Sequence, residues 1–235
     1  SPSLEEKLTE GLENSGCEIY RIGLGPTPML YFASNYYKAD GAIQVTGSHN
    51  PKDYNGFKIV LNQNSFFGED IQKLGHLAIK GYSKTYNGFS KSVEISSKYI
   101  DEITKPLKNI DRELHKKTIV WDCGNGASGP SVEMLTKKIP GKHVVLYSKD
   151  DGNFPNHHPD PTVDSNLVDI VKKIKDGNYD LGMAFDGDAD RLGVISPQGE
   201  IIFPDRQMIM FSRQVIESSP NANIVFDIVS FRIFI

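Results

Sequence analysis

Short apolar runs alternate with amphipathic stretches along most of the chain. Leu4, Leu8 and Leu12 recur every four residues and Gly16 follows them, which predicts an amphipathic helix with a glycine stop. The residues that follow predict a first α/β unit, with strands over 17–22, 42–46 and 57–61 and helices over 29–38, 69–80 and 97–108.

A second α/β unit begins with an apolar strand over 118–121, which runs directly into Asp122-Cys123-Gly124-Asn125-Gly126. Pro130 favours the first turn of the next helix, and Asp164 or Ser165 can cap a later helix that ends near Gly177. The remaining predicted elements are strands over 144–147 and 181–185, a hairpin over 192–195 and 201–203, a helix over 205–217 and a strand over 224–226. Because helices alternate with short strands, we predict an α/β fold with mixed sheets between helices.

Composition narrows the class of protein. Of 235 residues, 38% are hydrophobic and 24% are charged, which is typical of a soluble globular protein. The net charge of -4 and the lack of a basic run argue against nucleic-acid binding. No signal peptide or membrane-spanning stretch is evident, so a cytoplasmic protein without membrane partners is expected. Cys17 and Cys123 match no metal or redox spacing, and both are interpreted as small core residues in a reduced compartment.

An acidic cluster follows the strand over 181–185. Asp186, Asp188 and Asp190 are spaced two apart, so their carboxylates can converge on one point, and oxygen ligands suit Mg²⁺ or Ca²⁺. An EF-hand is excluded because Arg191 stands where that loop needs glycine and Pro197 where it needs glutamate. An acidic turn is the alternative. A divalent metal site is favoured, since ligands of α/β folds gather at the ends of buried strands.

A serine stands in a tight turn at Thr46-Gly47-Ser48-His49-Asn50-Pro51, directly after an apolar strand. It does not match the nucleophile elbow of hydrolases, because Asn50 stands where that motif needs glycine. An isolated serine of this kind is usually an ordinary turn residue. The neighbouring His49, the basic Lys58 and the acidic loop elsewhere in the chain favour a chemical role instead.

A phosphorylated Ser48 and the acidic loop would both carry negative charge, so both would need a cation. A phosphoserine carries a charge of roughly -1.5 to -2. Two like charges about 4 Å apart repel by roughly 4 kcal/mol at an effective dielectric constant near 20. A divalent metal that bridges phosphate and carboxylates removes this repulsion and polarises the phosphorus. Lys58 and Arg191 could add positive charge at the phosphoryl oxygens, and the serine oxygen would act as a covalent phosphoryl carrier.

These residues resemble known motifs of the α-D-phosphohexomutases. The serine turn with Asp53-Tyr54-Asn55-Gly56-Phe57-Lys58 resembles their phosphoserine loop, and Asp186-Gly187-Asp188-Ala189-Asp190-Arg191 resembles their metal loop. The segment 122–126 matches the start of their second domain. Residues 151–161 look most like the bacterial phosphomannomutase/phosphoglucomutase branch. The resemblance covers about residues 3–227, with all four motifs in the family's order.

The resemblance implies a mechanism. Phosphorylated Ser48 would donate its phosphoryl group to mannose 1-phosphate or glucose 1-phosphate, which gives a hexose 1,6-bisphosphate. This intermediate would return its other phosphoryl group to Ser48 and leave as the 6-phosphate. Hexose 1,6-bisphosphate would also be the activator. The three aspartates and an oxygen at Ser48 would hold one Mg²⁺. His49 and Lys58 would handle protons and contact phosphate, and Arg191 would contact phosphate. The histidines at 157 and 158 would lie near the domain junction and not bind metal.

The resemblance also predicts tandem phosphohexomutase-type domains. Residues 1–109 would be domain I without its first strand, 110–203 domain II with the metal loop, and 204–235 a stub of domain III. Family members are about twice this length and have four domains, and the third domain's sugar-recognition loop and the fourth domain's phosphate loop have no counterpart here. Because the chain starts at Ser1 and ends in an apolar run over 228–235, it is interpreted as truncated before completing the third domain.

This deficit bears on activity. The missing domains would hold the sugar during turnover, so this chain alone is expected to have weak or no mutase activity and to expose apolar surface. One alternative is a non-catalytic remnant that folds and binds Mg²⁺ or sugar phosphate. Another is a metal-dependent phosphatase, in which water accepts the phosphoryl group. The sequence leaves open the preference for mannose or glucose, the oligomeric state and the phosphorylation of Ser48.

Overall fold

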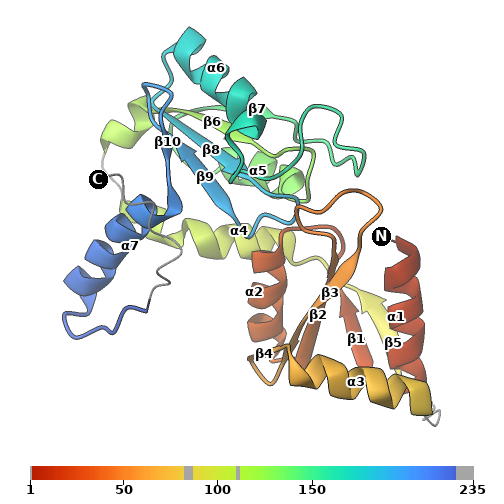
Figure 1. Ribbon diagram of the computed structural model, residues 1–235. Helices are drawn as coiled ribbons and strands as arrows, with labels where there is room; N and C mark the ends of the chain where they lie inside the picture. Colours follow the sequence, from red (N-terminus) through yellow and green to blue (C-terminus); the bar gives the residue numbers. More distant parts are fainter. Residues whose placement is uncertain (1, 82–86, 110–111, 226–235) are drawn as a thin grey trace.

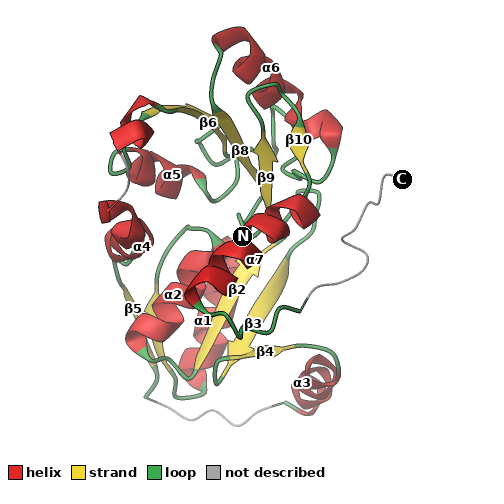
Figure 2. Cartoon of the chain, turned by 90° about the vertical axis from the view of Figure 1, so that its left-hand side faces the viewer, coloured by secondary structure: helices red, strands yellow, loops and turns green. Residues whose placement is uncertain are grey.

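The computed structural model describes residues 2–81, 87–109 and 112–225, and these form two α/β units (Figure 1). The first unit contains a two-stranded sheet of order β1-β5 and a three-stranded sheet of order β2-β3-β4. The second contains a five-stranded mixed sheet of order β10-β9-β8-β6-β7. The predicted α/β class with mixed sheets between helices is confirmed. Figure 2 shows the units one above the other, with α4 beside their junction.

The elements of the first unit are α1 (Pro2–Asn14), β1 (Glu18–Arg21), α2 (Thr27–Tyr37), β2 (Gly41–Thr46), β3 (Gly56–Leu61), β4 (Asn64–Phe66), α3 (Glu69–Lys80), β5 (Phe89–Ser92) and α4 (Ser96–Thr104). Strands β4 and β5 were not predicted. Strand β5 lacks an apolar run and forms because it pairs in parallel with β1, a contact that sequence periodicity does not reveal. The helix predicted to residue 108 is α-helical only to Thr104 and continues as a 3₁₀ helix over Lys105–Asn109, where Pro106 has no N–H to donate to the α-helical ladder.

The elements of the second unit are β6 (Thr118–Asp122), α5 (Gly129–Thr136), β7 (Lys142–Leu146), α6 (Val168–Gly177), β8 (Leu181–Phe185), β9 (Leu192–Ile195), β10 (Ile201–Ile202) and α7 (Pro204–Ser218), with 3₁₀ turns at Lys105–Asn109, Arg112–Lys116 and Asp164–Leu167. The strand predicted at 224–226 is wrong for its first two residues, since no described strand lies beside them for pairing. Its third residue and the apolar run over 228–235 lie outside the described residues.

A buried core holds α6 against the second sheet. Ile170 and Ile174 of α6 are fully buried against Val120 of β6 and Ala184 of β8. Gly182 permits this approach, because a Cβ there would lie 2.5 Å from the Ile174 Cδ1 atom. The other face of the sheet packs against α5. Strands β6 and β8 are parallel neighbours, so the loops that follow them leave the sheet at the same edge.

An ion pair ties the end of β6 to the long loop over 147–163. Asp122 is fully buried, and its Oδ2 lies 3.0 Å from the Nε2 of His157. The Nδ1 of His157 lies 3.0 Å from the carbonyl oxygen of His158, so both ring nitrogens face acceptors. Burial lowers the pKa of His157, but the Asp122 carboxylate and this carbonyl outweigh it and raise the pKa above 6.5. His157 therefore fixes this loop against the end of β6.

The two cysteines differ in environment. Cys123 is fully buried in the core under α5, as predicted, and burial raises the pKa of its thiol to about 12. Cys17 is exposed, so its interpretation as a core residue is wrong. It stands in the short connection between α1 and β1, just outside both elements. None of the helices in the described ranges is long and apolar enough to cross a membrane.

Truncating the core contact of α6 tests this packing. Ile174→Ala should lower the free energy of unfolding by about 3 kcal/mol, because it leaves a cavity between α6 and the sheet. Val168→Ala on the same helix should change it by less than about 0.5 kcal/mol, since Val168 is 60% exposed. Urea denaturation of both variants measures the difference, and equal effects would contradict the packing.

The ion pair at His157 predicts a pH-dependent contribution to stability. Because the folded-state pKa is raised, the contribution is fully present below the unfolded pKa near 6.5 and is lost as pH rises through the folded value. We expect His157→Gln to destabilise the chain more at about pH 6 than at about pH 9. Denaturant titrations of both proteins at the two pH values check this, and a pH-independent difference would refute the charged pair.

Candidate active site

Two loops from different units meet at one point. The first joins β2 to β3 and carries Ser48, and the second joins β8 to β9 and carries the acidic cluster. The hydroxyl of Ser48 donates a hydrogen bond to Asp186 Oδ2 over 3.0 Å. A Cβ atom at Gly187 would lie 2.2 Å from the Ser48 carbonyl oxygen, so only glycine lets the loops approach this closely. The structure thus brings together two motifs that lie far apart in the sequence.

The backbone of the serine loop holds Ser48 in an uncommon conformation. Ser48 has a φ of 51°, in the left-handed region that a non-glycine residue rarely adopts. Its N–H donates to the Oγ1 of Thr46 over 2.7 Å. The preceding Gly47 fits tightly, since a Cβ atom there would lie 2.6 Å from the carbonyl oxygen of Tyr54. Surrounding contacts therefore fix a strained turn that aims the Ser48 hydroxyl at the acidic loop.

The acidic loop gathers three carboxylates. Asp186 and Asp188 are buried and Asp190 is exposed, and one oxygen from each lies within 4.8 Å of the others. The Oδ2 of Asp188 accepts hydrogen bonds from Thr27 and Lys58, whereas its buried Oδ1 has no hydrogen-bond partner in the described part of the chain. A buried carboxylate oxygen without a donor suits a cation ligand. These residues therefore fit a divalent metal ion.

The electrostatics of the cluster are unbalanced. Burial raises the pKa of Asp186, and the carboxylates of Asp188 and Asp190 raise it further. Burial also raises the pKa of Asp188, but hydrogen bonds from Lys58 and Thr27 outweigh it and hold that pKa low. Lys58 itself loses solvation on burial, yet its two carboxylate partners raise its pKa and keep it an ammonium ion. One ammonium therefore faces three carboxyl groups, which leaves room for further positive charge.

The other predicted site residues take distinct positions. The Nδ1 of His49 lies 3.2 Å from the Ser48 oxygen. The Nζ of Lys58 donates to Asp188 Oδ2 over 2.6 Å and to Asp190 Oδ2 over 2.5 Å. The N–H of Arg191 donates to Asp186 Oδ1, and its guanidinium lies 3.7 Å from Asp160. His49 is thus at the serine and Lys58 at the aspartates, while the Arg191 side chain contacts the loop over 147–163.

Sequence reasoning missed two residues of the site, Thr27 and Asp160. The N–H of Thr27 donates to the carbonyl oxygen of Asp188 over 2.8 Å, and its hydroxyl donates to the carboxylate over 2.7 Å. No local pattern marks a threonine whose partner lies 161 positions away. Asp160 is fixed by the N–H and hydroxyl of Thr162 and faces Arg191.

The loop after β6 contacts the backbone of the acidic loop. The N–H of Ala127 donates to the carbonyl oxygen of Gly187 over 2.9 Å. A Cβ atom at Gly126 would lie 2.7 Å from that same oxygen, so the contact requires glycine. The motif over 122–126 therefore holds the backbone of the acidic loop in place.

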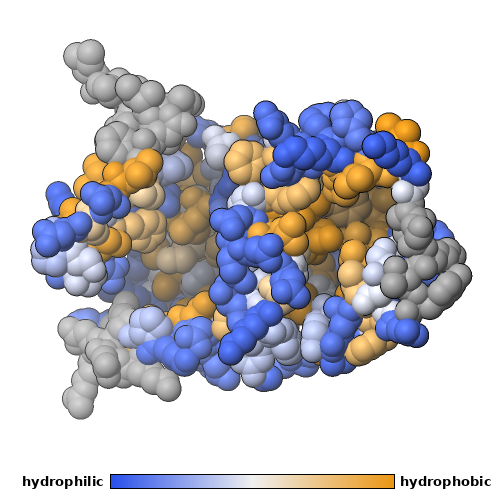
Figure 3. Space-filling model, turned by 90° about the horizontal axis from the view of Figure 1, so that it is seen from below, coloured by the Kyte–Doolittle hydropathy of each residue, from blue (hydrophilic) through white to orange (hydrophobic). Residues whose placement is uncertain are grey.

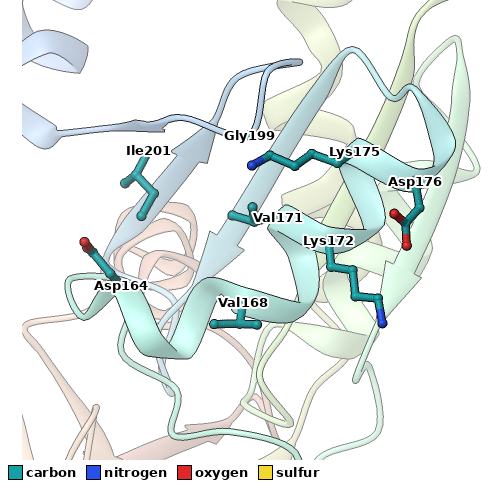
Figure 4. A pocket seen from close by; sticks show the side chains of 8 residues that line it. All are labelled: Asp164, Val168, Val171, Lys172, Lys175, Asp176, Gly199 and Ile201. Carbon is teal, nitrogen blue, oxygen red and sulfur yellow. The ribbon is translucent and has the colours of Figure 1, made fainter.

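A pocket of about 440 Å³ lies away from these loops, between α6 and β10 (Figure 4). Val171 and Ile201 supply its apolar side chains, while Lys172 and Asp176 project away from them. Its polar groups do not converge on a common point. The candidate active site is therefore the junction of the serine and acidic loops.

Comparisons with known proteins agree with this geometry. Residues 1–81 match the model of phosphoglucomutase/phosphomannomutase alpha/beta/alpha domain I, and residues 97–199 match the model of domain II. A phosphomannomutase/phosphoglucomutase from Pseudomonas syringae is 42% identical over 97% of this chain and 48% of its own length. A phosphoglucomutase from Neisseria gonorrhoeae is 41% identical over 99% of this chain and 50% of its own length.

A solved structure has a similar fold. A phosphoglucomutase/phosphomannomutase family protein from Burkholderia thailandensis superposes with a TM-score of 0.85 and 38% identity, covering 92% of this chain and 48% of that protein. The chain spans about half the length of the curated relatives it matches. Two consecutive family domains and both characteristic loops are present, and the chain therefore belongs to the phosphoglucomutase/phosphomannomutase family of α-D-phosphohexomutases.

Proposed function

We propose that this chain carries the phosphoryl-transfer half of a phosphohexomutase that interconverts hexose 1-phosphates and 6-phosphates of mannose or glucose. One observation carries the proposal: the Ser48 hydroxyl is hydrogen-bonded to Asp186 at the edge of a buried acidic cluster. The names of the relatives support the reaction class. Phosphorylated Ser48 would be the phosphoryl carrier, and hexose phosphates would be the substrates.

The acidic loop would hold one Mg²⁺ through Asp186, Asp188 and Asp190 together with an oxygen at Ser48. When bound, Mg²⁺ would neutralise negative charge and polarise the phosphorus. The unpartnered Oδ1 of Asp188 and the excess of carboxylates over ammonium groups support this assignment. Mg²⁺ is favoured over softer metals because every candidate side-chain ligand is a hard oxygen atom.

The basic residues would divide the remaining tasks. During transfer the bond between the Ser48 oxygen and phosphorus breaks while a sugar hydroxyl forms the new phosphorus–oxygen bond and loses its proton. His49, whose Nδ1 lies 3.2 Å from the Ser48 oxygen, is placed to give that departing oxygen a proton, so that the hydroxyl of Ser48 forms again as the sugar hydroxyl loses its own proton to the surroundings. The ammonium of Lys58 would stabilise charge on the phosphoryl oxygens. Arg191 would contact phosphate from its position against Asp160.

The sugar must also be held and turned between two transfers. Hexose 1,6-bisphosphate would be the intermediate and the activator, because either of its phosphoryl groups can charge Ser48. The described residues place the carrier and the acidic cluster together but supply few groups to position a sugar. We therefore propose that this chain exchanges a phosphoryl group while its mutase turnover is weak or absent. A second candidate is a chain that only binds Mg²⁺ or sugar phosphate, which the three clustered carboxylates would also permit.

Metal binding should depend on the buried carboxylate of Asp188. Mg²⁺ should raise the melting temperature of the parent chain, and Asp188→Asn should weaken its apparent affinity at least about tenfold. The effect should fade on acidification, because the raised pKa of Asp186 lets a proton compete with the ion at higher pH than at an ordinary aspartate. Thermal denaturation across Mg²⁺ concentrations measures this.

Asp176→Asn is the matched control, since Asp176 is exposed and lies outside the acidic loop. It should leave the Mg²⁺ response unchanged. Equal responses of the parent and Asp188→Asn would contradict the metal assignment.

Phosphoryl transfer should require Ser48. Incubation with hexose 1,6-bisphosphate and Mg²⁺ should add one phosphoryl group to the parent chain, visible by intact-protein mass spectrometry. Ser48→Ala should abolish the addition, because the other hydroxyl that the described residues hold at the acidic loop, that of Thr27, is fully buried. Ser65→Ala at an exposed position should retain it.

A coupled assay on glucose 1-phosphate and mannose 1-phosphate accompanies the labelling. Phosphorylation without steady-state turnover is the expected pattern. Full turnover would refute the predicted impairment, and absence of labelling in a folded chain would favour the remnant.

A further inference from the structure

The three carboxylates of the acidic loop share one feature: each has an oxygen that already accepts a hydrogen bond from the protein. The Oδ1 of Asp186 accepts from the backbone N–H groups of Asp190 and Arg191, each over 3.0 Å. The Oδ2 of Asp190 accepts from the ammonium of Lys58 over 2.5 Å. In the described part of the chain, these two carboxylates therefore each keep one oxygen that no backbone or ammonium group occupies.

Asp188 shows this division most clearly. Its Oδ2 accepts hydrogen bonds from the hydroxyl of Thr27 over 2.7 Å and from the Nζ of Lys58 over 2.6 Å. Its Oδ1 is buried and has no hydrogen-bond partner within residues 2–81, 87–109 and 112–225. Asp188 is 1% exposed and Thr27 is fully buried, so bulk water does not replace a lost donor. The two donors thus leave Oδ1 as the oxygen that Asp188 can offer to an ion.

Thr27 is fixed against Asp188 by its place in α2. It is the first residue of that helix, and the first N–H groups of a helix have no partner inside it. The N–H of Thr27 instead donates to the carbonyl oxygen of Asp188 over 2.8 Å. One threonine therefore binds both the carbonyl and the carboxylate of one aspartate. This double contact reaches from the first unit to the second and restrains rotation of the Asp188 side chain.

The surroundings of Thr27 are poor in polar groups. Seen from below, hydrophobic side chains line a hollow in the half of the molecule that carries the first unit (Figure 3). Met29 and Leu30, the next buried residues of α2, are apolar. The loss of the Thr27 hydroxyl would therefore weaken the hold on Oδ2 of Asp188 and would not pass it to a neighbour on this helix.

Coordination chemistry links these contacts to the choice of ion. Mg²⁺ takes about six ligands in an octahedral arrangement, whereas Ca²⁺ takes roughly six to eight oxygens and often uses both oxygens of one carboxylate. A carboxylate with one oxygen held by the protein binds an ion through the other oxygen. Three such carboxylates offer ligand atoms that lie within 4.8 Å of one another. This set leaves positions on Mg²⁺ for water or phosphate oxygens, and it denies Ca²⁺ the additional oxygens that it prefers.

We propose that Thr27 is a positioning residue that limits Asp188 to one ligand oxygen and thereby makes the acidic loop prefer Mg²⁺ to Ca²⁺. The inference rests on the proposed Mg²⁺ site and is independent of phosphoryl transfer. Removal of a group that hydrogen-bonds to a metal ligand commonly changes metal affinity by roughly 10–100-fold. Lys58 holds the same oxygen but also contacts Asp190, so Thr27 is the residue at which the effect can be isolated.

Thr27→Val tests the proposal, because valine keeps the branched shape of threonine and replaces only the hydroxyl with a methyl group. Thermal denaturation of the full 235-residue chain across MgCl₂ and CaCl₂ concentrations gives both apparent affinities without an activity measurement. The ratio of Mg²⁺ affinity to Ca²⁺ affinity should fall at least about tenfold in Thr27→Val. Thr27→Ser retains a hydroxyl and should keep the ratio within about threefold of the parent value.

Thr118→Val is the matched control. It removes a threonine hydroxyl that donates to an aspartate over 2.8 Å, but the acceptor is Asp180, outside the acidic loop. Both apparent affinities should stay at the parent values, because this hydrogen bond orients no ligand of the ion.

The outcomes separate this inference from the proposed function. A parent chain that binds neither ion would overturn the metal site and the role of Thr27 together. A parent chain that binds Mg²⁺ while Thr27→Val keeps the parent ratio would overturn the role of Thr27 alone. The parent chain should also bind Mg²⁺ more tightly than Ca²⁺, and the reverse preference would overturn the proposal even if Thr27→Val does not fold.

Discussion

Charge compensation among buried carboxylates is the constraint on which this site depends. Asp186 and Asp188 are almost completely buried, Asp190 lies beside them, and Lys58 alone provides an ammonium in contact with the cluster in the described part of the chain. Buried charge without a partner is expensive. The arrangement is therefore stable with Lys58 in place and is poised to accept more positive charge. A phosphoryl group on Ser48 would increase the demand for positive charge and would couple phosphorylation of the serine to the binding of a cation.

The carboxylates and Ser48 are held together by close backbone contacts between three loops. The parallel pairing of β6 and β8 sends two loops out at one edge of the sheet, and glycines let them touch. Gly126 packs on Gly187, and Gly187 in turn packs on Ser48 of the other unit. A side chain at either glycine would force the loops apart by displacing backbone atoms. Glycine residues thus set the distance between Ser48 and the carboxylates.

Local sequence patterns predicted most helices and the strands with apolar runs, because those elements carry their own periodicity. They missed β5, which has polar side chains and exists through its pairing with β1. For the site, charge complementarity and the family resemblance predicted that Ser48 and the acidic loop meet. It did not predict that Thr27 donates to Asp188 or that Asp160 faces Arg191, since both contacts arise from tertiary packing between distant segments. Cys17 was expected in the core by residue type alone, and its connecting segment leaves it exposed.

The central claim is that the serine carrier and the acidic cluster form one site, and ³¹P NMR of the phosphorylated chain with Mn²⁺ in place of Mg²⁺ tests it most directly. Mn²⁺ prefers the same oxygen ligands and broadens nearby resonances. We predict that stoichiometric Mn²⁺ broadens the phosphoserine signal at Ser48 beyond detection and that excess Mg²⁺ restores it. A sharp, unshifted signal in a chain that demonstrably binds Mn²⁺ would contradict the account, because the ion would then lie away from the phosphoryl group.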